Sequence, residues 1–229
     1  MAINAADGSL LVVNFHGLGP IPDHVDAGEA RVWCADVGLF AALLDSIAMV
    51  QAEHGLPVRI TFDDGNASDH AIALPLLADR GLAAEFFVCA GRIGQRLYLD
   101  SGQMAEMRAA GMRFGSHGWS HLNWRTADDA VLEQEINAAR TTIEAALGQP
   151  ITSVAIPFGS YDRRVMSRLG GFTSIYTSDG GFARTGARYL ARNSFTTDWS
   201  ARSLIDLAAN RSAGRQLKRD IIGLIKRLR

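Results

Sequence analysis

Residues 58–89, VRITFDDGNASDHAIALPLLADRGLAAEFFVC, decide the class of fold, because they contain a strand, a helix and a second strand in succession. The predicted strands, Val58–Phe62 and Ala84–Cys89, are rich in β-branched or aromatic residues and are nearly continuously apolar. The segment between them, Ser68–Arg80, has helical character. Two apolar strands joined through a helix are typical of a βαβ crossover, in which helices cover a parallel sheet.

The same alternation of strands and helices continues along the chain. The further predicted strands are Leu10–Phe15, Met112–Gly115, Ser153–Ile156, Ser174–Thr177 and a last one at Tyr189–Asn193. The further predicted helices are Val37–Glu53, Ser101–Ala110, Ala127–Leu147 and Asp162–Leu169. We therefore expect an α/β fold, a distorted and incomplete (β/α) barrel of about seven strands over residues 1–200. A doubly wound open sheet is the alternative.

Composition indicates an ordinary globular chain. The 229 residues are 48% apolar and 21% charged, and the net charge of −1 argues against a dedicated nucleic-acid binder. Cys34 and Cys89 are too few for a disulfide scaffold, so we expect both to be small buried side chains. The sequence shows no signal-peptide pattern and no apolar stretch long enough to span a membrane, and we expect a cytoplasmic location.

Residues 201–229 differ in charge from the rest of the chain. They hold eight basic and two acidic residues, a balance of +6, whereas the other 200 residues carry −7. Apolar residues recur there at helical spacing, at Leu217, Ile221, Leu224, Ile225 and Leu228. The basic residues between them are Arg215, Lys218, Arg219, Lys226 and Arg227. This pattern predicts a basic amphipathic helix, which either packs on the body with its charges in water or makes peripheral contact with a membrane or acidic partner through residues 215–229.

Polar residues gather where the predicted strands end. His16 follows the first strand, Asp63 and Asp64 follow the second, His117 follows the fourth and Asp179 the sixth. In α/β folds of either kind, the loops at the carboxyl ends of the strands carry the chemistry. We therefore expect these side chains to face one pocket.

Asp63, Asp64, His117 and His121 are the strongest candidates for a metal site. Adjacent carboxylates at the end of an apolar strand are costly without a cation, although an Asp-Asp-Gly turn is the structural alternative. In an extended segment the two carboxylates point to opposite sides, so that one binds a metal while the other stays free. His117 and His121 would face the same way on a helical turn, and a histidine pair with a carboxylate suits Zn²⁺, Co²⁺ or Ni²⁺.

Three motifs resemble the polysaccharide deacetylase family, the chitooligosaccharide deacetylase homology domain. They are Thr61-Phe62-Asp63-Asp64-Gly65, His117-Gly118-Trp119-Ser120-His121 and Pro157-Phe158-Gly159, and the similarity covers roughly residues 11–195. The resemblance implies a distorted (β/α) barrel with one divalent metal, zinc before cobalt or nickel, held by Asp64, His117 and His121. It also implies removal of an acetyl group from an N-acetylated or O-acetylated sugar, with metal-bound water as nucleophile and Asp63 as general base.

The sequence departs from the family pattern at three places. Ala155 stands where the family has an arginine that pairs with the catalytic aspartate, and Ser178-Asp179-Gly180-Gly181 lacks the family's tryptophan. No histidine follows His121 to act as the general acid. We expect Arg192 to replace the lost arginine beside Asp63 and His16 to reach the pocket, the alternatives being a surface arginine and a histidine satisfied by backbone.

The loops also supply candidates for substrate binding. The predicted contacts are Pro157, Phe158, Gly159, Tyr161, Trp119 and Asp179. Aromatic rings such as these, and Trp124, stack on sugars or simply pack against loops. A backbone N–H near Phe158 or Gly159 is a candidate donor to the oxyanion.

Three functions remain open from sequence. The first is a sugar deacetylase acting on a nucleotide sugar or a lipid-linked precursor of an exopolysaccharide or the cell envelope. The second is a non-catalytic carbohydrate-binding relative, which the missing arginine and histidine favour and Asp63 disfavours. The third is a metal-independent amidase on cyclic imides or ureides, which a metal-free protein would favour.

Overall fold

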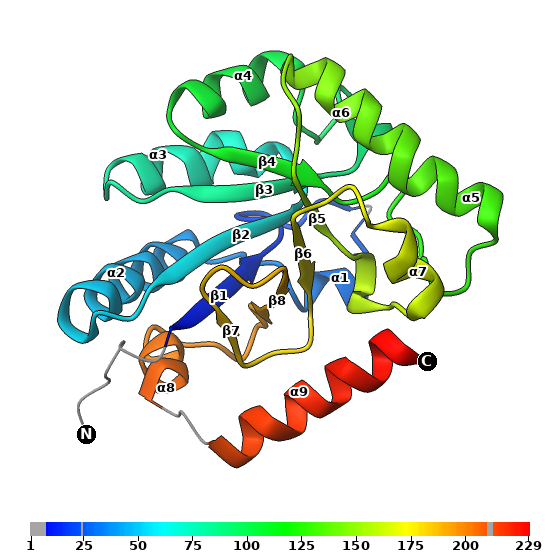
Figure 1. The fold of residues 1–229 in the computed structure, drawn as a ribbon. Helices are drawn as coiled ribbons and strands as arrows, with labels where there is room; N and C mark the ends of the chain where they lie inside the picture. The colour runs from blue at the N-terminus through cyan, green and yellow to red at the C-terminus, as the bar shows by residue number, and fades with distance from the viewer. Residues whose placement is uncertain (1–7, 24, 210–212) are drawn as a thin grey trace.

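A computed structural model describes residues 8–23, 25–209 and 213–229. Its strands curve into a nearly closed barrel, and helices surround most of it (Figure 1). The strands are β1 (Ser9–Phe15), β2 (Val58–Asp64), β3 (Ala84–Val88), β4 (Arg113–Ser116), β5 (Ser153–Ala155), β6 (Ser174–Thr177), β7 (Phe182–Arg184), β8 (Tyr189–Ala191) and β9 (Asn193–Ser194).

The strand order confirms the predicted (β/α) barrel. The path runs β7-β1-β2-β3-β4-β5-β6-β8, eight strands where about seven were expected, and β9 pairs with β1. The neighbours from β1 to β6, and β8 beside β6, are parallel, whereas β7 is antiparallel to β1. Because β1 to β6 lie side by side in chain order, the sheet has no reversal of strand order, and the doubly wound alternative is excluded.

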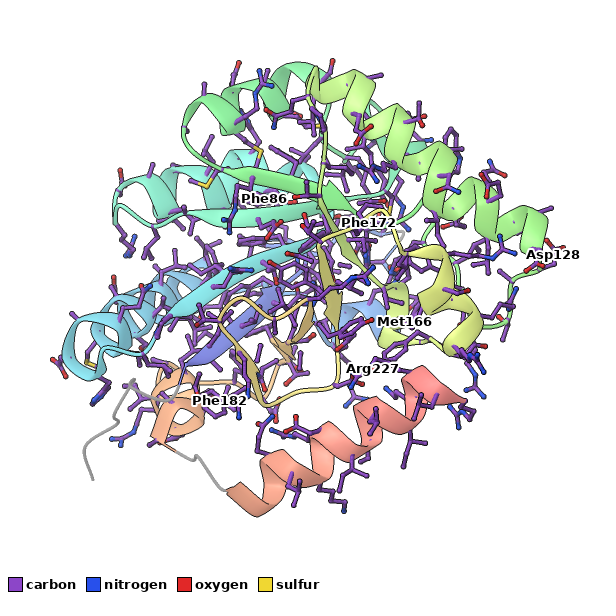
Figure 2. The ribbon with its side chains drawn as sticks, viewed as in Figure 1. Phe86, Asp128, Met166, Phe172, Phe182 and Arg227 are labelled. Atoms are coloured by element: carbon purple, nitrogen blue, oxygen red, sulfur yellow. The ribbon has the colours of Figure 1, made fainter. Side chains whose placement is uncertain are left out.

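The helices follow the predicted alternation. They are α1 (Ala27–Ala30), α2 (Val37–His54), α3 (Leu74–Ala78), α4 (Ser101–Ala109), α5 (Asp129–Glu133), α6 (Ala139–Leu147), α7 (Arg163–Arg168), α8 (Ser203–Ala209) and α9 (Ala213–Leu228). Two π-helical turns, Asp69–Ala73 and Gln134–Ala138, lie within the predicted helices 68–80 and 127–147. Figure 2 shows Phe86 and Phe172 among the dense side chains between strands and helices.

The core has two layers because strand side chains alternate between the two faces of the sheet. Outside the barrel wall, Phe15 and Phe62 pack with Phe40 of α2. Inside it, Val12 and Tyr176 belong to a second apolar cluster. Burial on both faces explains why the strands are nearly continuously apolar. Cys34 and Cys89 are free and buried, as expected.

The C-terminal segment corrects one expectation. Leu204 and Ala208 of α8 are buried in the outer core. Helix α9 packs on the body through its polar side, with Gln216 and Lys226 bonded to it, and its apolar side is exposed, Leu217 by 61%. Of the two alternatives from the sequence, packing on the body with the charges in water is therefore not what is observed. The side chain of Arg215 and residues 210–212 lie outside the described part. In the described ranges, no helix is long and apolar enough to cross a membrane.

Candidate active site

A pocket of about 510 Å³ lies at the carboxyl ends of the barrel strands. Six of the residues that line it were expected there from the sequence, namely His16, Asp63, Asp64, His117, His121 and Phe158. Others, including Trp33, Arg92 and Tyr98, come from loops that the sequence did not single out, and Ser178 comes from the Ser178–Gly181 motif after the sixth predicted strand. The expected gathering of strand-end residues in one pocket is therefore observed for all but Asp179, which does not line the pocket and pairs with Lys226 of α9 instead.

Asp64, His117 and His121 form a three-donor cluster. One ligand atom from each lies within 4.8 Å of the others. Nε2 of His121 is 3.5 Å from Oδ1 of Asp64, and Nε2 of His117 is 3.9 Å from the same oxygen. Nδ1 of His117 lies 2.9 Å from the carbonyl oxygen of Ala155, a contact that assigns the proton to Nδ1 and leaves Nε2 as the free donor atom.

The backbone that carries the cluster differs from the expected one. His117 and His121 do not share a helical turn, because the chain from 117 to 121 is an irregular loop and His121 has a φ of 59°. Asp63 and Asp64 do not point to opposite sides either. Oδ2 of Asp63 and Oδ1 of Asp64 lie 3.8 and 3.9 Å from Nε2 of His117. The left-handed φ of 78° at Asp64 ends the strand alternation and turns both carboxylates to one side.

The donor set fits a divalent metal that prefers nitrogen ligands. Burial lowers the pKa of His117 to about 4, so its imidazole is neutral at neutral pH. Burial alone would raise the pKa of Asp64, but the neighbouring histidines, His121 first, hold this pKa below its usual range. Two imidazoles and one carboxylate match the ligands of catalytic zinc sites and suit cobalt or nickel as well.

Arg192 lies beside Asp63, as predicted from the sequence. Its Nη1 and Nη2 donate to Oδ1 and Oδ2 of Asp63 at 2.7 and 2.8 Å, and it is 1% exposed. Asn14 donates to Oδ2 of Asp63 at 3.0 Å and accepts from Nη1 of Arg192 at 2.9 Å, while Thr61 donates to the same amide oxygen. The guanidinium lost at Ala155 is thus supplied from the segment after β8.

These contacts keep Asp63 charged. Burial alone would raise the pKa of Asp63, but Arg192, with a smaller effect from His117, holds it well below the usual range. His16 approaches from β1 with Nε2 3.9 Å from Oδ2 of Asp63. Its Nδ1 is buried and has no hydrogen-bond partner among the described residues. Asp63 can therefore accept a proton at neutral pH. His16 lines the same pocket, so a group bound next to Asp63 would also lie close to His16.

Glu135 positions the loop of the two histidines and was not found from the sequence. It is 2% exposed and accepts from the backbone N–H of Trp119 at 3.0 Å and of Ser120 at 2.9 Å. The indole of Trp124 donates to it at 3.2 Å. Gly118 permits this approach, because a Cβ there would lie 2.5 Å from the Glu135 carboxylate.

We predict that Glu135→Gln weakens metal binding about 10- to 100-fold, because groups that hold metal ligands in place typically contribute that much to affinity. Titration calorimetry with Zn²⁺ measures the change. Glu133→Gln is the matched control, since the carboxylate of Glu133 is exposed and, among the residues that the structure describes, accepts only from Asn137. Equal affinities of the two variants would contradict a positioning role for Glu135.

Of the predicted substrate contacts, Phe158 lines the pocket. It is 64% exposed, has a φ of 57°, and its ring lies 4.5 Å from that of His121. Pro157 and Gly159 belong to the same turn, but both are buried and neither lines the pocket. The N–H of Gly159 already donates to the Ile156 carbonyl at 3.0 Å. Of the two proposed oxyanion donors, Phe158 N–H is the better candidate.

The other predicted substrate contacts lie outside the pocket lining. Trp119 packs against Gly91, where a Cβ would lie 2.8 Å from its indole nitrogen, and Trp124 is fully buried. Tyr161 is buried and donates to Asp179 at 2.6 Å beneath α9. Trp119, Trp124 and Tyr161 therefore pack within the protein, the alternative considered from the sequence. Besides Phe158, the aromatic rings that line the pocket are those of Trp33 and Tyr98.

Known proteins share the fold and the sequence pattern. Residues 52–172, more than half of the chain, match the family model described as "Polysaccharide deacetylase". A chitin deacetylase of Pestalotiopsis sp is 32% identical over an alignment of 150 residues that covers 58% of this chain and 50% of that protein. The chain thus spans about half the length of the curated relatives it matches.

Solved structures resemble the whole barrel. The Streptococcus pyogenes deacetylase PplD in complex with acetate has a TM-score of 0.71 at 21% identity, over 87% of this chain and 98% of that one. IcaB from Ammonifex degensii has a TM-score of 0.72 at 23% identity, over 88% and 96%. At these identities the likeness shows a common fold. Together with the family match over residues 52–172, it shows that the chain belongs to the polysaccharide deacetylase family.

Proposed function

We propose that the chain removes an acetyl group from an N-acetylated, or less often O-acetylated, sugar of a polysaccharide or its precursor. One observation carries this proposal: the Asp64–His117–His121 cluster and Asp63, which is paired with Arg192, line the same pocket. Family membership and the similarity to a chitin deacetylase support it. Arg192 at Asp63 weakens the case for a binding-only relative, because it restores the pair that Ala155 had put in doubt.

The residues divide the chemistry between them. A divalent metal, zinc first, would be held by Asp64, His117 and His121, and when bound it supplies a water of lowered pKa and polarises a carbonyl. Asp63 accepts the proton of the attacking water, and Arg192 fixes its orientation through two parallel hydrogen bonds. Phe158 covers the pocket beside His121 and restricts where the acetyl group sits.

We propose that His16 protonates the leaving nitrogen or oxygen, in place of the histidine that the chain lacks. Its support is the position of Nε2, 3.9 Å from Oδ2 of Asp63 and on the lining of the pocket. His16→Gln is expected to lower kcat about 100-fold, the smaller end of general acid catalysis. His70→Gln, which removes a histidine paired with Glu106 away from the pocket, is the control. An unchanged kcat in His16→Gln would remove it from the mechanism.

We propose a nucleotide sugar or a lipid-linked precursor of an exopolysaccharide or envelope polymer, handled in the cytoplasm. The free, buried thiols of Cys34 and Cys89 suit a reducing compartment. Cell fractionation tests this location. The membrane contact predicted for residues 215–229 involves the exposed face of α9 and is independent of the pocket chemistry.

Acetate release from acetylated sugars by the zinc-loaded protein tests the proposed function. We expect turnover by the wild type and a loss of about 1,000-fold or more in Asp63→Asn, since proton transfer contributes up to about 10⁴-fold. Asp45→Asn is a matched control, because Asp45 is an exposed carboxylate paired with Arg80. Turnover that persists in Asp63→Asn, or activity on cyclic imides without metal, would contradict the proposal.

A further inference from the structure

Helix α9 presents an apolar face to solvent. Six of the eleven exposed large hydrophobic residues in the described ranges belong to it, namely Leu217, Ile221, Ile222, Leu224, Ile225 and Leu228. Their exposed fractions lie between 43% and 67%. Single exposed apolar residues are ordinary, but a contiguous group on one helix face marks an interaction site.

The opposite face of α9 is fixed to the barrel, so the apolar face cannot turn inward. Gln216 donates to the carbonyl of Phe182 and accepts from its N–H, both at 2.9 Å, and so pairs with the backbone of β7. Lys226 donates to Oδ1 of Asp179 at 2.5 Å. Figure 1 shows α9 alongside the barrel, and Figure 2 shows Arg227 and Phe182 where the two meet.

The charge of α9 complements an anionic surface. Residues 201–229, which end in α9, carry a net charge of +6 against −7 for the rest of the chain. Lys226 is already paired with Asp179 on the barrel side of the helix. Lys218 and Arg229 are exposed beside the apolar residues. A helix that lies in a membrane interface combines such an apolar face with flanking cations, which meet anionic headgroups.

We propose that α9 binds the surface of a bilayer that contains anionic lipids, with its apolar face in the lipid and its polar face on the barrel. Its 16 residues span about 24 Å and include five basic side chains, so it suits a position in the interface and not a span. A second copy of the chain is a poorer occupant, because pairing two such faces would bring two strongly basic helices together.

The attachment would place the pocket close to the membrane. Asp179 and Tyr161, which meet α9, belong to the loops after β6 and β5. The same loops contribute Ser178 and Phe158 to the pocket. A lipid-linked substrate would then reach the pocket from the bilayer. This consequence rests on the proposed function, but the binding of α9 to a membrane does not depend on it.

Co-sedimentation of the full chain with vesicles tests the proposal. The wild type is expected to bind phosphatidylcholine vesicles that contain phosphatidylglycerol and to bind pure phosphatidylcholine weakly. Leu217→Asn/Ile221→Asn/Leu224→Asn is expected to reduce the bound fraction at least about tenfold, because it removes the apolar anchor. The matched control, Ile21→Asn/Leu97→Asn/Leu122→Asn, changes three residues that are 39% to 44% exposed elsewhere and should bind as the wild type does.

Three results would overturn the proposal. The first is equal sedimentation of the wild type with and without vesicles. The second is equal binding of the α9 variant and the wild type to the vesicles. The third is a lipid-free dimer by sedimentation equilibrium that the α9 variant converts to monomer, which would mean that the apolar face binds a second copy of the chain. Acetate release from a water-soluble sugar should stay unchanged in the α9 variant, so failure of membrane binding is distinguishable from failure of the deacetylase proposal.

Discussion

Zinc added to the metal-free protein is expected to bind at about one equivalent, and His117→Ala/His121→Ala is expected to abolish this binding. The physical reason is the donor set: one carboxylate and two imidazoles, with ligand atoms within 4.8 Å of one another. Removing both imidazoles leaves Asp64 alone, and a single carboxylate does not hold zinc. Elemental analysis after dialysis against Zn²⁺ measures the stoichiometry.

The control for this experiment is His54→Ala/His70→Ala, which removes two histidines outside the cluster and should keep the metal. Metal retained by the His117/His121 variant would place the site elsewhere in the chain. A wild type that binds neither Zn²⁺ nor Co²⁺ would contradict the metal-dependent mechanism and favour the metal-independent amidase. Because the measurement needs no substrate, it separates the metal site from the identity of the sugar.

The fold was predictable because its signals are local. Residues 58–89 show two apolar strands around one helix, and burial on both faces of a parallel sheet requires that pattern. The short antiparallel β7 was not predicted. It is three residues long, and its pairing with β1 lies far away in the sequence.

The site was predictable only in part. Asp63 and Asp64 stand out because two adjacent carboxylates end an apolar strand. Glu135 does not, because its role depends on the N–H groups of Trp119 and Ser120, which the fold brings to it from another segment. Asn14 carried a weak signal, as the one amide in an otherwise apolar strand, but its partners Asp63 and Arg192 are 49 and 178 residues away.

The orientation of α9 could not be predicted from the sequence. Periodicity defines an apolar and a polar face on a helix, but not which face the body covers. Here Gln216 and Lys226 have specific partners on the barrel, at Phe182 and Asp179. Those hydrogen bonds, which no local pattern encodes, leave the apolar side exposed.

Arg192→Met is expected to destabilise the metal-free protein by roughly 3–5 kcal/mol at pH 7, because it leaves Asp63 as a buried charge without its partner. Both side chains are almost fully buried, so water does not replace the guanidinium. Urea unfolding in EDTA measures the change. Arg113→Met is the control, since its contact with Glu85 is long, at 3.7 Å, and its side chain is 60% exposed, and such pairs contribute about 0–1 kcal/mol.

A double variant separates the lost charge from lost packing. Asp63→Asn/Arg192→Met removes both charges, so it should be clearly more stable than Arg192→Met alone, since no uncompensated buried carboxylate remains. If the double variant were as unstable as or less stable than the single one, the cost would come from packing around Phe87 and Tyr176, whose rings lie under the guanidinium.

The unfolding free energies of the wild type and of Arg192→Met should depend on pH in opposite directions. In the wild type the pKa of Asp63 is held below its unfolded value, so its stabilisation is present above about pH 4 and is lost as the pH falls through the folded pKa. Without Arg192, burial raises that pKa above the unfolded value, and the variant therefore gains stability as the pH falls toward about 4. The free-energy difference between wild type and Arg192→Met should be largest at pH 7 and shrink toward pH 4. A difference that stays constant over this range would mean that Asp63 is not the charge that Arg192 neutralises.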